Sequence, residues 1–283
     1  MHRGNAILLA ATCAGAVVAM LGAAAAVRPP GPAAAQPPAS PSLSTSVATT
    51  ATSAPAPPLP DEAALAALVP GRLSVLVHDR ETGQDVVSHR PDAVYPSASL
   101  VKLLIALEAL RRGEPDGDVV GMLSRSDDAV ANRLWTKLGG PSLVTRWAAR
   151  AGLTATRPPA DPLHWGSTLV TAADVARIYA YLLDEAPEGT RQVVLDALGN
   201  ATHRGADGFD QFFGIPAAVP GGWAVKQGWS CCDPGRNLHT SGLVGARYVV
   251  VVLTAQPAAT GWAVATQRVT AVVKALSDPL GWS

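Results

Sequence analysis

The order of the expected strands constrains this fold more than any other feature of the sequence. A hairpin is expected early, with strands over 73–78 and 85–89 joined by a turn at Glu81–Gln84. Three further strands are expected in the last third, over 223–229, 238–244 and 248–253. Strands at both ends of the region predict one sheet assembled from its two termini, with helices as a lobe across it.

The middle of the region has a helical pattern. Apolar residues recur at helical spacing after Ser99, and Gly113 ends that helix. A second helical pattern runs from Met122 to Leu153 and is interrupted at Gly139–Pro141. Further helices are expected over 61–69, 172–183, 190–198 and 263–276.

Two segments precede this region, and neither has the pattern of a folded core. An uninterrupted apolar run extends from Ala6 to Val27, a length typical of a signal peptide or of a single membrane anchor. Residues 28–60 are almost only Pro, Ala, Ser and Thr, which predicts a disordered linker, either a spacer or passive filler. We therefore expect residues 1–27 to be an export segment, cleaved or retained, and residues 61–283 to be one exported domain, secreted or membrane-anchored.

Charge and cysteine content exclude several classes of protein. The 22 basic and 22 acidic residues give a formal net charge of zero, and no basic patch is visible, so we expect no nucleic-acid partner. No zinc-type spacing of Cys and His occurs, and we expect no metal, no cofactor and a monomer. Thr12 before Cys13 argues against lipid attachment there. The adjacent Cys231 and Cys232 form either a strained disulfide or two free thiols.

Lysine is rare in this chain, which makes each one informative. Only four of the 22 basic residues are lysine, and one of them, Lys102, follows Ser99 by three residues at the start of an expected helix. Residues three apart share a helix face, so the amine of Lys102 reaches the Ser99 hydroxyl. Unlike arginine, lysine can give up its proton when it is buried, and it can then activate a serine nucleophile without histidine.

Two more motifs follow Ser99-x-x-Lys102 in a familiar order. Ser126-Asp127-Asp128 falls in a loop of the helical part, and Lys226-Gln227-Gly228 falls on a strand. This arrangement resembles the superfamily of class A β-lactamases and penicillin-binding proteins, over most of Leu73 to Leu276. The resemblance implies an α+β fold, an α/β/α sandwich with an antiparallel sheet flanked by helices and a reduced all-helical lobe.

The resemblance also implies a role for each motif residue. Ser99 would be the nucleophile, Lys102 its base, and Ser126 the relay of a proton to the leaving nitrogen. The backbone N–H groups of Ser99 and Trp229 would form an oxyanion hole. Lys226 completes the catalytic set, and the residues expected to contact substrate are Asp128, Gln227 and Gly228. The alternative is that Lys102 is a solvated helix residue and Lys226 an exposed residue on an edge strand.

The chain departs from the family pattern at two substrate-binding positions. Asp128 stands where the family has asparagine, and a carboxylate cannot donate to a substrate carbonyl. Near Lys102, it would also favour the charged ammonium. Gln227 stands where the family has threonine or serine. Both changes argue against the usual binding pose of a β-lactam.

The loop that should clear the acyl-enzyme lacks its glutamate. Between Gly152 and Leu183 the acidic residues are Asp161 and Asp174, and Asp161 is the candidate for activating water. Its alternative is a turn residue before a proline. We expect His164 to be a packing or capping residue. The segment between Arg112 and Ser126 is short, so part of the helical lobe is expected to be missing.

Two functions remain open on the sequence. The first is an exported serine hydrolase, acylated at Ser99 by a β-lactam or a cell-wall-peptide type of amide bearing a carboxylate, with slow or unusual deacylation. The second is a non-catalytic, wall-associated binding module that keeps the fold, which Asp128 and Gln227 favour. Small molecules or peptidoglycan are the expected ligands.

Overall fold

The computed structural model describes residues 57–232 and 235–282. The chain divides into two units, Met1–Thr52 and Ser53–Ser283, and the described residues belong to the second. The predictions for residues 1–27 and for most of the linker over 28–60 therefore lie outside the described residues. Within the described part of the chain, no helix is both long and apolar enough to cross a membrane.

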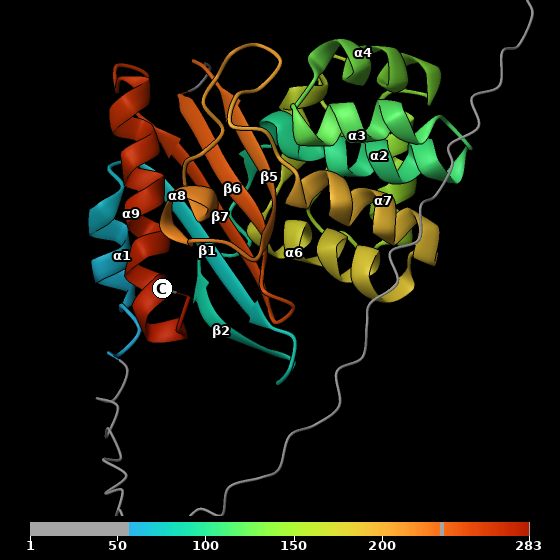
Figure 1. Cartoon of the computed structure of the whole chain (residues 1–283). Coiled ribbons are helices and arrows are strands. Elements are labelled where there is room, and N and C mark those ends of the chain that lie inside the picture. Colours follow the sequence, from blue (N-terminus) through green and yellow to red (C-terminus); the bar gives the residue numbers. More distant parts are fainter. Residues whose placement is uncertain (1–56, 233–234, 283) are drawn as a thin grey trace, which may run out of the picture. The chain divides into compact units, whose positions relative to one another are not determined.

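Five antiparallel strands form the central sheet, in the spatial order β2-β1-β7-β6-β5 (Figure 1). They are β1 (Arg72–Asp79), β2 (Gln84–His89), β5 (Trp223–Ser230), β6 (Arg236–Val244) and β7 (Tyr248–Gln256). β1 pairs with β7 along its whole length, from Arg72 opposite Ala255 to Asp79 opposite Tyr248. The prediction of one sheet assembled from both ends of the domain is confirmed.

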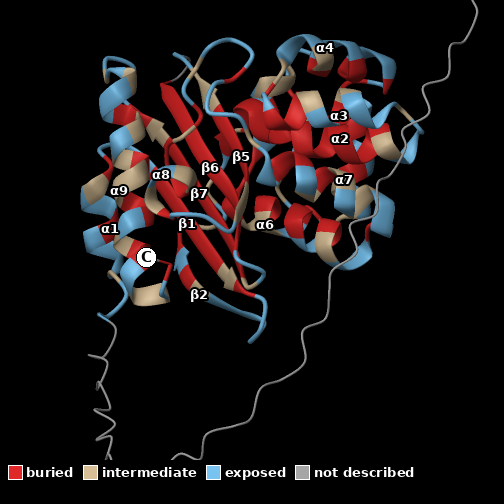
Figure 2. Cartoon of the chain, in the orientation of Figure 1, coloured by how far each residue is buried: buried red, intermediate tan, exposed pale blue. Residues whose placement is uncertain are grey.

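Alternate side chains of the strands face two hydrophobic cores. Val250 and Val252 of β7 belong to one core, and Val249 and Val251 belong to the other. Because both faces of the sheet are covered, its central strands are buried along almost their whole length (Figure 2).

Helices cover both faces of the sheet (Figure 1). One face carries α1 (Glu62–Leu68), α8 (Ile215–Ala218) and α9 (Trp262–Leu280). The other face carries the helical lobe, which consists of α2 (Lys102–Arg111), α3 (Asp116–Ser124), α4 (Asp128–Lys137), α5 (Pro141–Arg150), α6 (Ala172–Ala180) and α7 (Glu188–Gly199). The predicted α+β architecture, with helices on both faces of an antiparallel sheet, is confirmed.

The helical pattern that begins at Met122 is broken at residues 125–127, between α3 and α4. This break is the loop in which the sequence placed Ser126-Asp127-Asp128. Ser126 has a left-handed backbone conformation, with φ of 52°. The Asp127 carboxylate then caps α4 by accepting from the N–H groups of Ala129 and Val130. The short segment after Arg112 still holds one helix, α3.

A two-stranded sheet that the sequence did not reveal lies beside the lobe. β3 (Tyr95–Pro96) pairs with β4 (Leu169–Val170), and the N–H of Ser97 donates to the carbonyl of Thr168 at 2.7 Å. Strands of two residues have no periodicity to detect. They fasten the segment that leads to Ser99 to the end of the 151–168 loop.

Candidate active site

Ser99 and Lys102 lie at the start of the first helix of the lobe. A 3-10 turn, η1 (Ala98–Val101), carries Ser99, and α2 begins at Lys102. Ala98 has a φ of 45°, an uncommon conformation for a residue with a side chain, directly before the serine. The Lys102 amine lies 3.0 Å from Ser99 Oγ, and both side chains are buried.

Ser126 lies between the two lysines. Its Oγ is 3.1 Å from Lys102 Nζ and 3.0 Å from Lys226 Nζ. Lys226 on β5 is 1% exposed and Lys102 is 0% exposed, so neither is the solvated residue that the alternative interpretation requires. The structure therefore brings together Ser99, Lys102, Ser126 and Lys226 in one continuous chain of polar contacts.

Lys102 also forms an ion pair at the edge of this chain. Its amine lies 2.5 Å from Asp128 Oδ1 and 2.8 Å from the carbonyl oxygen of Ser126. Burial lowers the pKa of Lys102 below its usual value, although the Asp128 carboxylate acts in the opposite direction. Asp128 thus offsets part of the effect of burial on Lys102.

Among the described residues, no carboxylate forms an ion pair with Lys226. Lys226 donates to Ser126 Oγ and, at 2.8 Å, to the carbonyl of Gln227. Burial, and then the neighbouring charge of Lys102, hold the pKa of Lys226 well below its usual value.

A cleft of about 560 Å³ opens above these groups. Ser99 and Trp229 line the same cleft, as the oxyanion-hole prediction requires. Asp128 and Asn132, one helical turn apart on α4, form part of one wall. The other lining residues are Pro96, Ala98, Leu163, His164, Trp165, Gly166, Ser167, Ser230 and Cys231.

The side chains of two tryptophans form walls of the cleft, and of these two residues the sequence analysis assigned a role only to the backbone N–H of Trp229. Trp165 lies over Lys102, 4.8 Å from the ring centre to Nζ, and its indole N–H donates to Asn132 at 2.7 Å. Trp229 stacks on Phe209 with ring centres 4.8 Å apart, and its indole N–H donates to Asp207. Without the fold, nothing distinguishes these from core aromatics.

Gln227 does not point into the cleft. Its amide donates to the carbonyl oxygens of Gln211 at 2.9 Å and Phe213 at 2.6 Å. Gln211 in turn donates to the carbonyl of Ser124, two residues before Ser126. The expectation that Gln227 contacts substrate is therefore at odds with the structure: its longer side chain reaches past the cleft and positions the Ser126 loop.

Gly228 has a packing reason to be glycine. A Cβ built there would lie 3.1 Å from the carbonyl oxygen of Ser97 and 3.4 Å from the Ala98 Cβ. β5 is an edge strand of the sheet, and η1 packs against it. The absence of a side chain at Gly228 lets the segment carrying Ser99 approach β5 closely.

The loop predicted to hold the deacylating group contains a hydrogen-bonded pair, Asp161 and His164. Asp161 does not line the cleft; its oxygens accept from the N–H of Leu163 at 2.9 Å and from His164 Nδ1 at 2.7 Å. These hydrogen bonds lower the pKa of Asp161. His164 lines the cleft and its side chain is 71% exposed, so it is not a packing residue. Of the packing and capping roles expected for it, it has the position of a cap, before the 3-10 turn Trp165–Ser167, but its side chain makes no capping hydrogen bond. The Asp161-x-x-His164 spacing was the signal available in the sequence.

Asp174, the other acid of that region, has a structural role. Its buried carboxylate accepts from the backbone N–H groups of Thr154, Ala155 and Thr156 and pairs with Arg177. It therefore fixes the start of the loop and takes no part in the cleft.

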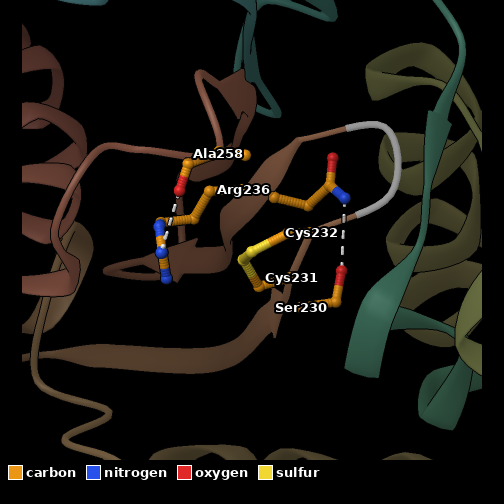
Figure 3. The surroundings of a disulfide bond; sticks show 6 residues. Ser230, Cys231, Cys232, Arg236 and Ala258 are labelled. Atoms are coloured by element: carbon orange, nitrogen blue, oxygen red, sulfur yellow. Dashed lines mark hydrogen bonds between the residues drawn. A yellow bond between two sulfur atoms is a disulfide. The ribbon is translucent and has the colours of Figure 1, made fainter.

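The two adjacent cysteines form a disulfide next to the cleft (Figure 3). Of the two states left open by the sequence, the structure has the bonded one. Cys231 lines the cleft directly after Ser230, and Ser230 Oγ accepts from Asn237 at 3.2 Å. Among the described residues, no group of three or more His, Cys, Asp or Glu is placed to hold a metal ion.

Solved structures of known proteins share this architecture. Solved structures with the same fold include a class A β-lactamase from Mycobacterium abscessus, 24% identical, with a TM-score of 0.64 over 77% of this chain and 97% of that one. A β-lactamase from Streptomyces albus G is 21% identical, with a TM-score of 0.63 over 78% and 99% of the two chains. The fold is that of class A β-lactamases.

Sequence comparisons give the family. A profile of the β-lactamase enzyme family matches residues 61–117. A protein of Mycobacterium tuberculosis and Mycobacterium bovis named "Putative lipoprotein LppW" is 40% identical over 225 residues, 72% of this chain and 70% of that one. This chain belongs to the β-lactamase family.

Proposed function

We propose that this protein is an exported serine hydrolase that is acylated at Ser99 by an amide-type carbonyl compound. The observation that carries the proposal is the contact chain from Ser99 Oγ through Lys102 and Ser126 to Lys226, with every link between 3.0 and 3.1 Å. Buried amines in contact with hydroxyls are what a serine nucleophile needs when no histidine serves as its base. Family membership supports the same chemistry.

In the acylation step, Ser99 Oγ attacks the carbonyl carbon while its proton passes to the neutral amine of Lys102. Collapse of the tetrahedral adduct breaks the carbon–nitrogen bond. The proton then moves from Lys102 through the Ser126 hydroxyl to the departing nitrogen. The products are an ester at Ser99 and a free amine, and Lys102 is neutral again. Lys226 holds the Ser126 hydroxyl in place for this transfer.

The developing negative charge on the carbonyl oxygen is assigned to the backbone N–H groups of Ser99 and Trp229. Both residues line the cleft, and the tight packing at Gly228 brings their two segments together. An oxyanion hole needs this rigidity because its donors must be in place before the charge forms.

For the hydrolysis step we assign His164 as the base and Asp161 as the residue that positions it. The hydrogen bond from Nδ1–H to the Asp161 carboxylate leaves Nε2 as a proton acceptor in the neutral imidazole. Water gives a proton to Nε2, its oxygen attacks the ester carbon, and the Ser99 oxygen leaves and regains a proton. Asp161 itself, with its lowered pKa, is a weak base.

Export and a cell-wall setting fit the family relationship. The relative's name contains the word lipoprotein, and residues 6–27 have the apolar composition expected of an export segment. β-lactams and cell-wall peptides are therefore the first acyl donors to try. The ion pair between Lys102 and Asp128 favours the alternative, a binding module without turnover, because a charged amine cannot act as a base.

Covalent labelling with a fluorescent penicillin tests the proposal. The parent should gain the label and the mass of one acyl group, and the Ser99→Ala variant should gain neither. Ser167→Ala, which removes another hydroxyl that lines the cleft, is the matched control and should label like the parent. If no donor labels Ser99 in the folded parent, the binding module is the better description.

A further inference from the structure

The charge pattern of the cleft points to a kind of substrate that the family resemblance does not. Among the described residues that line it, Asp128 is the one carboxylate, and no lysine or arginine lines it. The two lysines lie beneath the cleft, where they contact the hydroxyls of Ser99 and Ser126. A ligand arriving from solvent therefore meets negative charge first.

Asp128 has spare capacity to accept a hydrogen bond. Its side chain is 60% exposed, and Oδ1 is the oxygen that contacts Lys102. Oδ2 has no hydrogen-bond partner among the described residues. A carboxylate offers about four lone-pair sites on its two oxygens, so one face of Asp128 stays open to the cleft.

By the family resemblance, Lys226 and Gln227 would bind a substrate carboxylate, but both side chains already have other partners. The Gln227 amide holds the carbonyls of Gln211 and Phe213. Lys226 is buried and already donates to Ser126 Oγ and to the backbone carbonyl of Gln227. Asp207, bound to the indole of Trp229, adds a second negative charge on that side. A carboxylate-bearing ligand gains little here and is repelled by both acids.

We propose that Asp128 binds an ammonium group on the acyl part of the substrate, so that Ser99 acts on amides or esters whose acyl side carries a free amine. This inference rests on the proposed function of Ser99. In the acylation step proposed above, the departing nitrogen takes its proton from Ser126, so we place it toward Ser126 and the acyl part toward Asp128 and Asn132, which line the cleft. The ammonium donates to Oδ2 of Asp128.

Binding of such a substrate also affects the protonation of Lys102, the proposed base. Asp128 favours the protonated form of Lys102 in the empty cleft. A second cation on the same carboxylate raises the local positive potential and therefore favours the neutral amine of Lys102. The substrate that fits the cleft is thus the one that prepares Lys102 to take the Ser99 proton.

Ampicillin and benzylpenicillin are matched probes, because they differ by one amino group on the acyl side chain. Acylation is followed by intact mass for the parent, Asp128→Asn and Asp92→Asn, the last being the same change at an exposed acid away from the cleft. The second-order rate constant for ampicillin should exceed that for benzylpenicillin by about tenfold, as expected of a hydrogen bond between charged groups. The ratio should fall to about one in Asp128→Asn and stay unchanged in Asp92→Asn.

A binding measurement separates this inference from the proposed function. Calorimetry on Ser99→Ala, with and without Asp128→Asn, gives the Kd of the same two compounds when no ester forms. A preference for ampicillin that depends on Asp128 supports the amine site even if the parent is never acylated. Equal Kd values for the two compounds, or a preference that survives Asp128→Asn, overturn it even if Ser99 is acylated.

Discussion

Single side chains decide whether this cleft is reactive, and Lys102 is the one with most contacts. It has Ser99, Ser126 and Asp128 within 3.1 Å, and it is fully buried. An ammonium group there holds the site together, whereas only the neutral amine can take a proton. The two roles of Lys102 can be separated by changing its ability to lose the proton while keeping its charge.

Lys102→Arg makes that separation. Arginine keeps the charge beside Asp128 but does not release a proton at accessible pH. Acylation of Ser99 should therefore slow by about 10²- to 10⁴-fold, the usual contribution of a general base. The rate is read from intact mass against time with an excess of donor. The control is Lys137→Arg, the same change at an exposed, ion-paired lysine, and this variant should react like the parent. If Lys102→Arg is acylated as fast as the parent, Lys102 is not the base.

The assignment of His164 predicts a change in one step of the reaction. His164→Gln should accumulate acyl-enzyme and clear it about 10²-fold more slowly, while the rate of labelling stays close to that of the parent. Pulse labelling followed by removal of donor measures the clearance. Asp161→Asn should have a smaller effect of the same sign, because the imidazole remains but is less well oriented. Parent-like clearance in His164→Gln would show that another group activates the water.

Among the elements of the fold, the strands and most helices could be predicted from sequence because their periodicity is strong. β7 is long and rich in β-branched residues, and α2 has an apolar stripe. The left-handed conformation of Ser126 and the short pair β3 and β4 could not be predicted from the periodicity of the sequence.

Part of the candidate site could likewise be predicted from the sequence, and part could not. The order of the motifs predicted that Ser99, Lys102, Ser126 and Lys226 come together, because each motif lies in or beside an element with a recognisable pattern. The direction of the Gln227 side chain could not be read from its position on β5. It depends on the carbonyl groups of Gln211 and Phe213, in a loop with no periodicity. The pairing of His164 with Asp161 also required the loop conformation.

A buried carboxylate on α2, that of Glu108, connects α2 to α5 in the helical lobe. Glu108 accepts hydrogen bonds from Arg111, Arg112 and Arg146, and from the indole of Trp147 on α5. Burial raises the pKa of Glu108, but the three arginines outweigh it and lower the pKa to about 2. The carboxylate therefore favours folding above the pKa of the unfolded chain, near 4.5, and this contribution is lost as pH falls toward 2.

Glu108→Gln should show this dependence in urea unfolding at several pH values. At pH 7 the variant should be less stable than the parent by about 3 kcal/mol, and the difference should shrink steadily below about pH 4.5. Glu188→Gln, an exposed acid on α7, should change stability little at any pH. A Glu108→Gln deficit that is the same at pH 7 and pH 3 would assign the effect to packing rather than charge.

At the scale of the whole domain, one sheet connects two separate cores. β7 contributes alternate side chains to both, so neither face can lose its packing without disturbing the other. We therefore expect the described domain to unfold as one cooperative unit despite its helical lobe.

Two matched truncations test this coupling. Leu104→Ala lies in the lobe core and Leu276→Ala in the core under α9, and both side chains are fully buried. Each should cost about 2–5 kcal/mol. In each variant, circular dichroism and tryptophan fluorescence should give the same single transition. A variant with two resolved transitions would show that the lobe and the sheet unfold separately.

The reactive groups come from three stretches of chain: the continuous η1 and start of α2, the turn before α4, and β5. Between Ser99 and Lys226 lie more than a hundred positions of sequence, so no fragment or half-assembled chain holds the whole set. An acylating dye therefore doubles as an active-site titrant: the fraction of molecules it modifies counts the correctly assembled ones in any preparation, before a natural substrate is known.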